Sequence, residues 1–519
     1  MDWMWFCIWS TISFAASALL VVAFSNKKSR DGTDNVPPGP PGWPVIGNMF
    51  DLSSSKPHQT LADLKNKYGP LIWLRLGSVN TMVVSSAEAA MEMFKNNDLA
   101  FNGRTITEAM RACSYNEGSM ALAQYGPYWR LLRRICTAEL LTNTRMKESE
   151  KVRRKCINNM VRWISDEMQE KGGVEIARHL SYMSFNVIGN LMLSRDLVDP
   201  QSKEGDEFFT SVSQFLEWGG KPNVADFFPL LKRLDPQGIK KKMERDLGLA
   251  LGFASGFVKE RIQQRRKSDE EQRKKDFLDL LLEFQGDENA GEPAKIMEKD
   301  VNVLILELFT ASTDTVTSTL EWAMTELLCN TRVLSEVQAE LNRAVGGKTS
   351  IEEEDIESLP YLQAVVKETL RLHPPVPLLV PHKAMEKVEF MGYSIPKDTQ
   401  ILVNVWAIGR DPTNWDDPLS FKPERFMSSS TVDYKGQHFQ LIPFGAGRRI
   451  CVGLPLAHRM LHLTLASLLH SFEWTLETGM TPKTMDMKER MGITLRKADP
   501  LKAVAKPRNN LLQETKTQT

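Results

Sequence analysis

A single cysteine lies in a segment whose residues suit a bound metal ion and a flat ligand. Residues 444–453 read Phe-Gly-Ala-Gly-Arg-Arg-Ile-Cys-Val-Gly, with the cysteine at position 451. The glycines let the backbone approach a flat ligand and turn sharply around Cys451, and Arg449 can face a carboxylate. A cysteine thiolate bound to iron pushes electron density to the opposite face of the metal and favours cleavage of the dioxygen bond. The segment therefore predicts an iron-binding thiolate.

The other cysteines give no sign of a structural metal site or of disulfide pairing. They are scattered along the chain without a Cys-x-x-Cys pair, as Cys7, Cys113, Cys136, Cys156 and Cys329. This spacing favours neither a zinc finger nor a disulfide scaffold, and it fits a reducing compartment. We interpret Cys113, Cys136, Cys156 and Cys329 as inert, buried small residues.

A hydroxyl group stands beside a carboxylate in the middle of a predicted helix. The helical pattern over residues 301–328 contains Ala-Ser-Thr-Asp-Thr at positions 311–315. A mid-helix threonine can bend the hydrogen-bond ladder and hold a water molecule, so Asp314 and Thr315 form a candidate proton relay for oxygen reduction. The alternative is an ordinary threonine-rich buried helix in which neighbouring groups satisfy Asp314.

Further charged residues occur in two short motifs. Glu368 and Arg371 are three residues apart, which puts a carboxylate and a guanidinium on one helical face. By itself such a pair is usually a surface ion pair. A second arginine, Arg425, follows in Pro-Glu-Arg-Phe, and Trp-Arg-Leu-Leu-Arg stands at residues 129–133.

These motifs occur in the order found in one large enzyme family. The chain resembles the cytochrome P450 superfamily, whose cysteine loop reads Phe-x-x-Gly-x-Arg-x-Cys-x-Gly and is matched at Phe444, Gly447, Arg449, Cys451 and Gly453. The resemblance covers nearly the whole chain and implies a cytochrome P450 fold with a haem b cofactor. It implies that Cys451 ligates the haem iron, that Arg449 contacts a haem propionate, and that Phe444 and Gly453 lie beside the cofactor near the thiolate.

The same resemblance assigns roles to residues outside the cysteine loop. It implies that Trp129, Arg133 and His382 bind haem propionates. Asp314 and Thr315 are the implied catalytic residues. The chain departs from the family pattern at Ser312, where the family has glycine, and at Val316, where it has threonine or serine. Ser312 could narrow the groove opposite the cysteine or add a hydrogen bond there.

The resemblance also implies that Glu368, Arg371 and Arg425 form a buried triad that braces the cysteine loop. We interpret this triad as structural and not catalytic. Breaking it would leave an unpaired buried charge, at a cost of roughly 3 to 5 kcal/mol, and we expect loss of haem as the consequence.

The electrons for oxygen reduction must come from another protein. The sequence contains no Gly-x-Gly-x-x-Gly loop, since residues 445–447 lack its third glycine, and Gly-Gly-Lys-Thr at 346–349 reads as a loop after a helix. The resemblance implies that a separate NADPH-dependent flavoprotein reductase, NADPH-cytochrome P450 reductase, supplies electrons, with cytochrome b5 as an occasional partner. Arg130 and Arg134 are either simply solvated or part of a basic docking surface for an acidic donor.

Composition and hydropathy patterning indicate one large globular body. Of 519 residues, 42% are hydrophobic and 25% are charged, and the formal net charge of zero disfavours a nucleic-acid partner. Helical patterns dominate, so the expected fold class is mainly α with a smaller β region (α+β). We expect a hairpin formed by residues 71–76 and 81–84, and a second β region at 388–402. The tail after Pro500 is polar, and we expect it to fray.

The beginning of the chain has the pattern of a membrane anchor. Residues 3–24 are uncharged and mostly apolar, and as a helix this stretch is long enough to cross a bilayer. Lys27, Lys28 and Arg30 follow, so the positive-inside rule places the body in the cytosol. We predict a single pass through the endoplasmic reticulum membrane, with a cleavable signal peptide as the alternative. The predicted divisions are a membrane anchor at 1–30, a proline-rich hinge at 31–44, the haem-thiolate monooxygenase domain at 45–505 and a flexible tail at 506–519.

The substrate class rests on a narrower resemblance. Residues 220–229, 234–238 and 309–311 look like those of the plant microsomal group that contains geraniol hydroxylases and iridoid oxidases. This implies O2-dependent hydroxylation or successive oxidation of a small apolar metabolite, with a monoterpenoid or iridoid as the best guess. The alternatives are an alkaloid or phenylpropanoid (flavonoid) hydroxylase, or a non-catalytic haem-binding sensor. The segments expected to shape the pocket are 105–122, 215–218, 308–312, 376–380 and 491–493.

Overall fold

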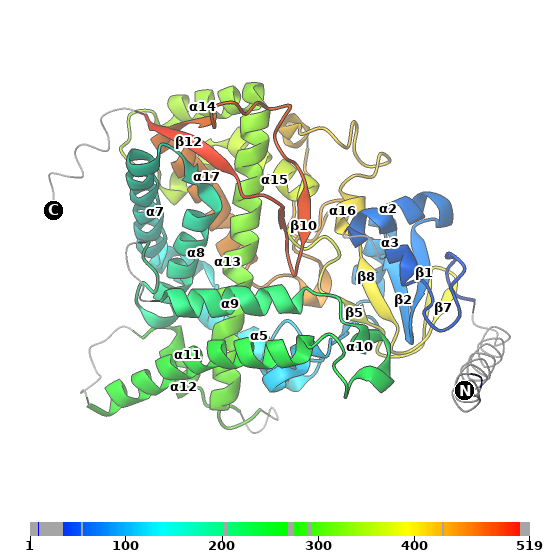
Figure 1. Ribbon diagram of the computed structural model, residues 1–519. Helices are drawn as coiled ribbons and strands as arrows, with labels where there is room; N and C mark the ends of the chain where they lie inside the picture. The colour runs from blue at the N-terminus through cyan, green and yellow to red at the C-terminus, as the bar shows by residue number, and fades with distance from the viewer. Residues whose placement is uncertain are drawn as a thin grey trace, which may run out of the picture.

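The computed structural model describes Trp9 and residues 35–52, 56–200, 205–267, 275–287, 292–427 and 430–508. Helices make up most of the body and the larger sheet lies to one side of it (Figure 1), which confirms the mainly helical fold class. The longer helices are α2 (Pro57–Tyr68), α5 (Pro127–Ile135), α7 (Glu150–Lys171), α8 (Ile176–Leu193), α9 (Asp206–Gly219), α11 (Ile239–Lys267), α13 (Glu298–Cys329), α14 (Thr331–Val345), α15 (Pro360–Leu372) and α17 (Leu454–Ser471). The shorter helices are α3 (Ala87–Met91), α4 (Tyr115–Gly118), α6 (Asn143–Glu148), α10 (Val224–Phe227), α12 (Phe277–Glu283) and α16 (Val405–Ile408).

The long helix α13 runs through the middle of the body (Figure 1) and contains the whole of the predicted helix 301–328. It packs against α8, α11, α15 and α17. Several of its hydroxyl groups bond back to the helix, as Thr319 Oγ1 does to the carbonyl of Thr315 at 2.9 Å. These bonds satisfy polar groups that burial would otherwise leave unpaired, so a threonine-rich helix is stable in the interior.

The predicted hairpin is confirmed as β1 (Leu71–Leu76) and β2 (Val79–Val84), paired antiparallel with Leu76 opposite Val79. β2 begins two residues earlier than predicted because the turn is only Gly77-Ser78, and the φ of +58° at Gly77 suits glycine in such a tight turn.

The hairpin is one end of a five-stranded sheet. Its order is β1-β2-β8-β5-β3, with β8 at Gln400–Val403, β5 at His382–Lys383 and β3 at Gly103–Arg104. β6 (Val388–Phe390) and β7 (Tyr393–Ile395) pair separately, so the predicted β region at 388–402 is confirmed. In the pairing of β3 with β5, Arg104 lies opposite His382.

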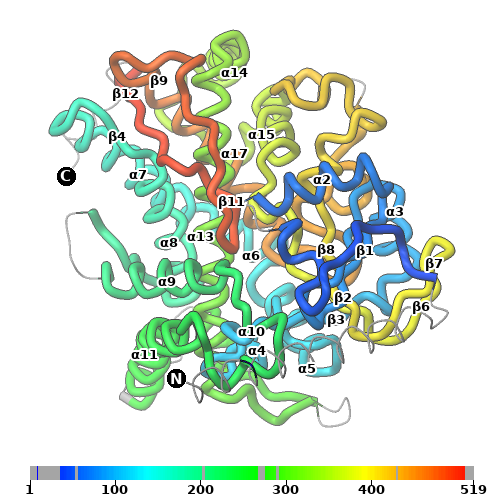
Figure 2. The backbone as a smooth tube through the Cα atoms, turned by 45° about the vertical axis from the view of Figure 1, so that its right-hand side comes forward, coloured from blue at the N-terminus to red at the C-terminus, as the bar shows by residue number. Residues whose placement is uncertain are grey.

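The end of the chain differs from the expectation. β12 (Lys502–Pro507) pairs with β9 (Phe472–Leu476) and with β4 (Val174–Glu175), beside α7 and α17 in Figure 2. The prediction that the chain frays after Pro500 is therefore wrong for residues 502–507. Ala503 and Ala505 are buried at alternate positions, and two small residues give too weak an apolar signal to reveal a strand. A last hairpin pairs β10 (Glu489–Met491) with β11 (Leu495–Lys497).

The start of the described body is a proline-rich strap along β1. Trp73 N donates to the carbonyl of Pro38 at 2.9 Å, and Asn48 Nδ2 donates to that of Pro40 at 3.1 Å. The described part of the predicted hinge is thus packed on the sheet. The predicted anchor at 1–30 lies outside the described residues except for Trp9, and within the described ranges no helix has the length and apolarity needed to span a bilayer.

The three charged residues of the predicted triad lie together. Arg371 donates to both carboxylate oxygens of Glu368, at 2.7 and 2.8 Å, and Arg425 Nε donates to Glu368 Oε1 at 3.0 Å. Both guanidinium groups also donate to backbone carbonyls between residues 409 and 420. The triad therefore ties α15 to this long connecting segment; a bracing effect on the cysteine loop stays a prediction.

Replacing Glu368 with glutamine should lower the free energy of unfolding by roughly 3 to 5 kcal/mol, because two arginines lose their anionic partner in a buried site. Denaturant titration followed by circular dichroism measures this value. Glu357→Gln, at an exposed position, is the matched control and should change it by less than about 0.5 kcal/mol. Equal effects of the two substitutions would contradict the structural role of the triad.

Candidate active site around Cys451

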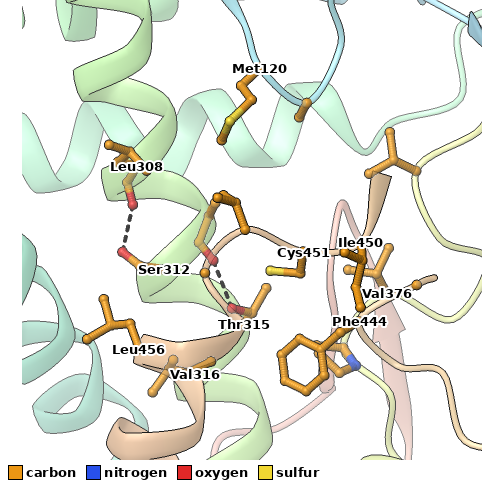
Figure 3. Close-up of a pocket in the computed structure, with 18 of the residues that line it drawn as sticks. Met120, Leu308, Ser312, Thr315, Val316, Val376, Phe444, Ile450, Cys451 and Leu456 are labelled. Carbon is orange, nitrogen blue, oxygen red and sulfur yellow. Dashed lines mark hydrogen bonds between the residues drawn. The ribbon is translucent and has the colours of Figure 1, made fainter. Parts of the chain in front are cut away.

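A cavity lies between α13, the start of α17, the cysteine loop and the segment around α5. The volume of the cavity is about 300 Å³. Every residue predicted to contact the cofactor lines it: Trp129, Arg133, His382, Phe444, Arg449, Cys451 and Gly453. In Figure 3 the sulfur of Cys451 points into the cavity toward Ser312 and Thr315 of α13.

The cysteine loop owes its shape to two glycines and one backbone hydrogen bond. Gly445 and Gly447 have φ values of +70° and +66°, in the left-handed region that glycine adopts without strain. Cys451 N donates to the carbonyl of Phe444 at 2.9 Å, which closes the loop. The helix α17 begins at Leu454, so the cysteine lies just before its N-terminus.

The pKa of the Cys451 thiol is subject to opposite effects from burial and from the groups around the sulfur. Burial raises the pKa, whereas hydrogen bonds from the backbone N–H groups of Gly453 and Leu454 and the charge of Arg133 lower it. These are the groups that would stabilise a thiolate. Burial has the larger effect, so the pKa of Cys451 is raised, and burial likewise raises the pKa of Cys136, to about 12.

The interpretation of the remaining described cysteines holds in part. Cys136 and Cys156 are buried, as predicted. The prediction is wrong for Cys113, which is exposed, and Cys329 is only half-buried. Cys113 lies at a kink where its φ is +51°, between two short helical turns, and a hydropathy pattern does not reveal such a change of direction.

Three guanidinium groups share the cavity wall, and none of them forms an ion pair with a carboxylate in the described part of the chain. Arg449 donates to the backbone carbonyls of Asn102 and Ala123 at 3.0 and 2.9 Å, and its buried Nη1 has no hydrogen-bond partner. Arg133 donates to the carbonyl of Ile450 at 2.7 Å. Arg104 donates to two carbonyls, one of them that of Val380 at 2.6 Å.

Two uncharged side chains, Trp129 and His382, lie beside these guanidinium groups. Trp129 has the guanidinium carbon of Arg449 4.5 Å from its ring centroid and that of Arg133 at 5.6 Å. His382 Nδ1 lies 2.9 Å from the carbonyl of Phe101, so in the neutral ring Nδ1 carries the proton and Nε2 is free. Burial lowers the pKa of His382, and the charge of Arg104 lowers it further.

The charges disfavour one another in the cavity without an anion. Burial lowers the pKa of Arg449 to about 10, and repulsion from Arg133 contributes; burial and the charge of Arg449 lower the pKa of Arg104. A ligand with two carboxylates would offset this repulsion and would pair with the free Nη1 of Arg449. The residues present therefore fit a haem, which brings two propionates and an iron that a thiolate can ligate.

Sequence reasoning missed Arg104 because nothing in its local pattern marks it. Arg104 reaches the cavity because β3 pairs with β5. These strands have two residues each and lie far apart in the chain, so the sequence gives no local sign of their pairing. Asn102, whose Oδ1 accepts from Arg449 Nε at 2.8 Å, was missed for the same reason.

The wall opposite Cys451 is formed by one face of α13. Ser312 and Thr315 line the cavity (Figure 3), and their hydroxyls donate to the carbonyls of Leu308 and Ala311 at 2.6 and 2.8 Å. Ala311 is exposed although α13 lies in the interior, because it faces the cavity. Val316 contributes an apolar surface beside them.

The structure separates the two predicted catalytic residues. Thr315 faces the cavity, whereas the buried Asp314 does not line it and instead contacts Thr494 and Arg496. These are the neighbouring groups that the alternative interpretation requires. The part of Asp314 in a proton relay stays a prediction, and this geometry limits it to an indirect one.

Three of the five segments expected to shape the pocket reach the cavity. From segment 105–122, Met120 and Ala121 line the cavity. Segments 308–312 and 376–380 each contribute several lining residues. No residue of 215–218 or 491–493 lines it; Phe215 packs on Tyr115 at a ring distance of 5.2 Å.

The two arginines considered for docking lie on the surface of α5. Arg130 stacks on Tyr125 with 5.6 Å between the guanidinium carbon and the ring centroid, and Arg134 forms an ion pair with Glu292 at 2.7 Å. Both side chains are exposed.

Comparison with known proteins agrees with this geometry. The family model described as cytochrome P450 matches residues 37–502. An iridoid oxidase from Catharanthus roseus is 52% identical over 504 residues, which are 96% of this chain and 97% of the relative. A geraniol 8-hydroxylase from the same plant is 44% identical and covers 95% of this chain and 98% of its own length.

A solved structure of zebrafish cytochrome P450 with progesterone superposes with a TM-score of 0.73 at 27% identity, over 87% of this chain and 99% of that one. Since the family model and these relatives span most of the chain, it belongs to the cytochrome P450 family of haem-thiolate monooxygenases.

Proposed function

We propose that this protein oxidises a monoterpenoid or iridoid, by one hydroxylation or by successive oxidations, with O2 and electrons from NADPH. The observation that carries the proposal is a thiol that faces an apolar cavity across from hydroxyl-bearing residues of α13, with buried arginines around it. The substrate class is supported by the relatives, which are named as an iridoid oxidase and geraniol 8-hydroxylases.

The proposed roles of the cavity residues follow from their chemistry. Cys451 ligates the iron, and Phe444 and Gly453 pack beside the sulfur and the cofactor. Trp129, Arg133, His382 and Arg449 hold the propionates, together with Arg104. Arg449 brings a free donor. The pKa of His382 is lowered by burial first and by the charge of Arg104 second, and an anion beside the ring would act in the opposite direction.

The reaction needs protons as well as electrons at the cavity wall. When bound, haem with a thiolate ligand supplies the reductive activation of O2 and the transfer of one oxygen atom to a carbon–hydrogen bond. The hydroxyl group of Thr315 donates its proton to the carbonyl of Ala311. Rotation of this side chain would direct the same proton toward the cavity. Asp314 acts from behind the helix: with Thr494 and Arg496 it forms a polar link between the buried helix and the half-exposed Arg496.

The two departures from the family pattern change the wall next to the reacting carbon. Ser312 adds volume where glycine would leave space, and its hydroxyl is already bonded to Leu308. Val316 replaces a hydroxyl with a methyl group. Both changes favour a substrate that is apolar where it meets the middle of α13.

The proposal includes the electron donors of the enzyme and its attachment to a membrane. A separate flavoprotein, NADPH-cytochrome P450 reductase, supplies electrons, with cytochrome b5 as a second donor. Residues 1–30 anchor the chain in the endoplasmic reticulum membrane by a single pass, and residues 31–44 connect the anchor to a cytosolic domain. The anchor is supported by the uncharged stretch at 3–24 and the cations that follow it.

Microsomes that contain the full chain and its reductase provide the test of substrate class. We expect NADPH-dependent products from geraniol or an iridoid alcohol, each identified by mass spectrometry as the substrate plus one oxygen atom or a further oxidised form. Conversion of an alkaloid or phenylpropanoid panel with no terpenoid product would overturn the substrate class. Spectral haem binding without turnover of any panel member would overturn the enzymatic role.

Thr315→Val should uncouple electron use from product formation, because valine keeps the shape and removes the proton donor. We expect the ratio of product formed to NADPH consumed to fall by roughly tenfold or more, within the range of a lost acid–base group. Thr313→Val is the matched control, since Thr313 is buried on the same helix, lies outside the cavity wall and has an unpaired hydroxyl. An unchanged ratio in Thr315→Val would contradict the role of this hydroxyl.

A further inference from the structure

One face of α13 forms the wall of the cavity from end to end. The positions on α13 that line the cavity are separated alternately by one and by three residues, which is the pattern of a single helical face. They are Glu307, Leu308, Ala311, Ser312, Thr315, Val316 and Thr319. Glu307 is the only carboxylate among the described lining residues, and it stands at the end of the face remote from Cys451 and Thr315.

Glu307 is held by the loop that covers this end of the cavity. Its Oε1 accepts hydrogen bonds from Ser119 Oγ and from Ala121 N, the latter at 3.0 Å. Its Oε2 accepts from Met120 N at 2.7 Å. A carboxylate has about four acceptor positions, so these bonds leave one free, on Oε2.

Burial raises the pKa of the Glu307 carboxyl group more than its three hydrogen bonds lower it. Glu307 is 5% exposed, and among the described residues no lysine, arginine or histidine forms an ion pair with it. Arg104 is near but donates to the carbonyl of Ala121 at 3.0 Å. A buried carboxylate with a free acceptor position gains from another donor, and the adjacent wall, with Met120 and Leu308, is apolar.

We propose that Glu307 is a subsite for the hydroxyl group of an alcohol substrate, which it holds so that the far end of the molecule reaches Thr315 and Cys451. The eight residues from Glu307 to Thr315 correspond to about 12 Å along the helix. Because an extended chain advances about 1.1–1.2 Å per bond, roughly ten bonds span this distance. An unbranched alcohol of about ten carbons, oxidised at the end remote from its hydroxyl, has that length, and geraniol, with about eight bonds between its oxygen and its remote end, is somewhat shorter.

This inference rests on the proposed function, and a structural role for Glu307 must be told apart from it. A carboxylate that only fastened the loop would affect all ligands alike. Ser119→Ala offers a matched control, because it removes one bond between the loop and Glu307 while leaving the free position on Oε2 in place.

The experiment measures dissociation constants by calorimetry on the haem-containing full chain in detergent. The ligands are geraniol and its methyl ether, and 1-decanol and its methyl ether. We expect the wild-type protein to prefer each alcohol over its ether by about tenfold to a hundredfold, the range of a hydrogen bond to a charged group. Glu307→Gln should abolish this preference, and Ser119→Ala should keep it while weakening both members of a pair equally.

The outcomes separate the subsite from the substrate class. A preference for decanol that depends on Glu307, without binding of geraniol, would support the subsite and overturn the terpenoid proposal. A wild-type protein with no preference in either pair, or a preference that survives in Glu307→Gln, would overturn the subsite. Geranylamine is the last probe: tighter binding than geraniol by more than tenfold would show that the carboxylate selects a cation instead of a hydroxyl.

Discussion

Arg104, Arg133 and Arg449 surround one cavity, and their side chains bind backbone carbonyls but no carboxylate of the residues that the structure describes. Their mutual repulsion and their burial lower the pKa values of Arg104 and Arg449. An anion inside this arrangement would stabilise the charged guanidinium groups, and a haem supplies two carboxylates together with an iron for the nearby thiol. Much of the architecture can be understood as the means of holding these groups in place without neutralising them.

Four parts of the fold carry out this positioning. The cysteine loop is shaped by left-handed glycines and ends where α17 begins, so that backbone N–H groups face the sulfur. The pairing of β3 with β5 places Arg104 opposite His382. The helix α13 supplies the facing wall, and its internally bonded hydroxyls allow polar groups to line a largely apolar space. The buried triad on α15 fixes the long segment that precedes the cysteine loop.

The sequence predicted what short motifs encode. The cysteine loop, the hairpin at β1 and β2, and the helix α13 have local signals, because glycine spacing, alternation and helical periodicity act over a few residues. Arg104 and Asn102 escaped prediction since their roles arise from pairing between distant segments. The strand β12 escaped because its buried residues are alanines. The direction of Asp314, away from the cavity and toward Arg496, depends on where β11 packs, and no local pattern contains that information.

The central claim is that the sulfur of Cys451, and no other cysteine, binds the iron. The most direct measurement is the difference spectrum of the reduced protein with carbon monoxide, recorded for Cys451→Ala and for Cys136→Ala, a buried cysteine outside the cavity wall. The wild-type protein and Cys136→Ala should show the absorption band of a thiolate-ligated haem, and Cys451→Ala should lack it. Persistence of that band in Cys451→Ala would contradict the account.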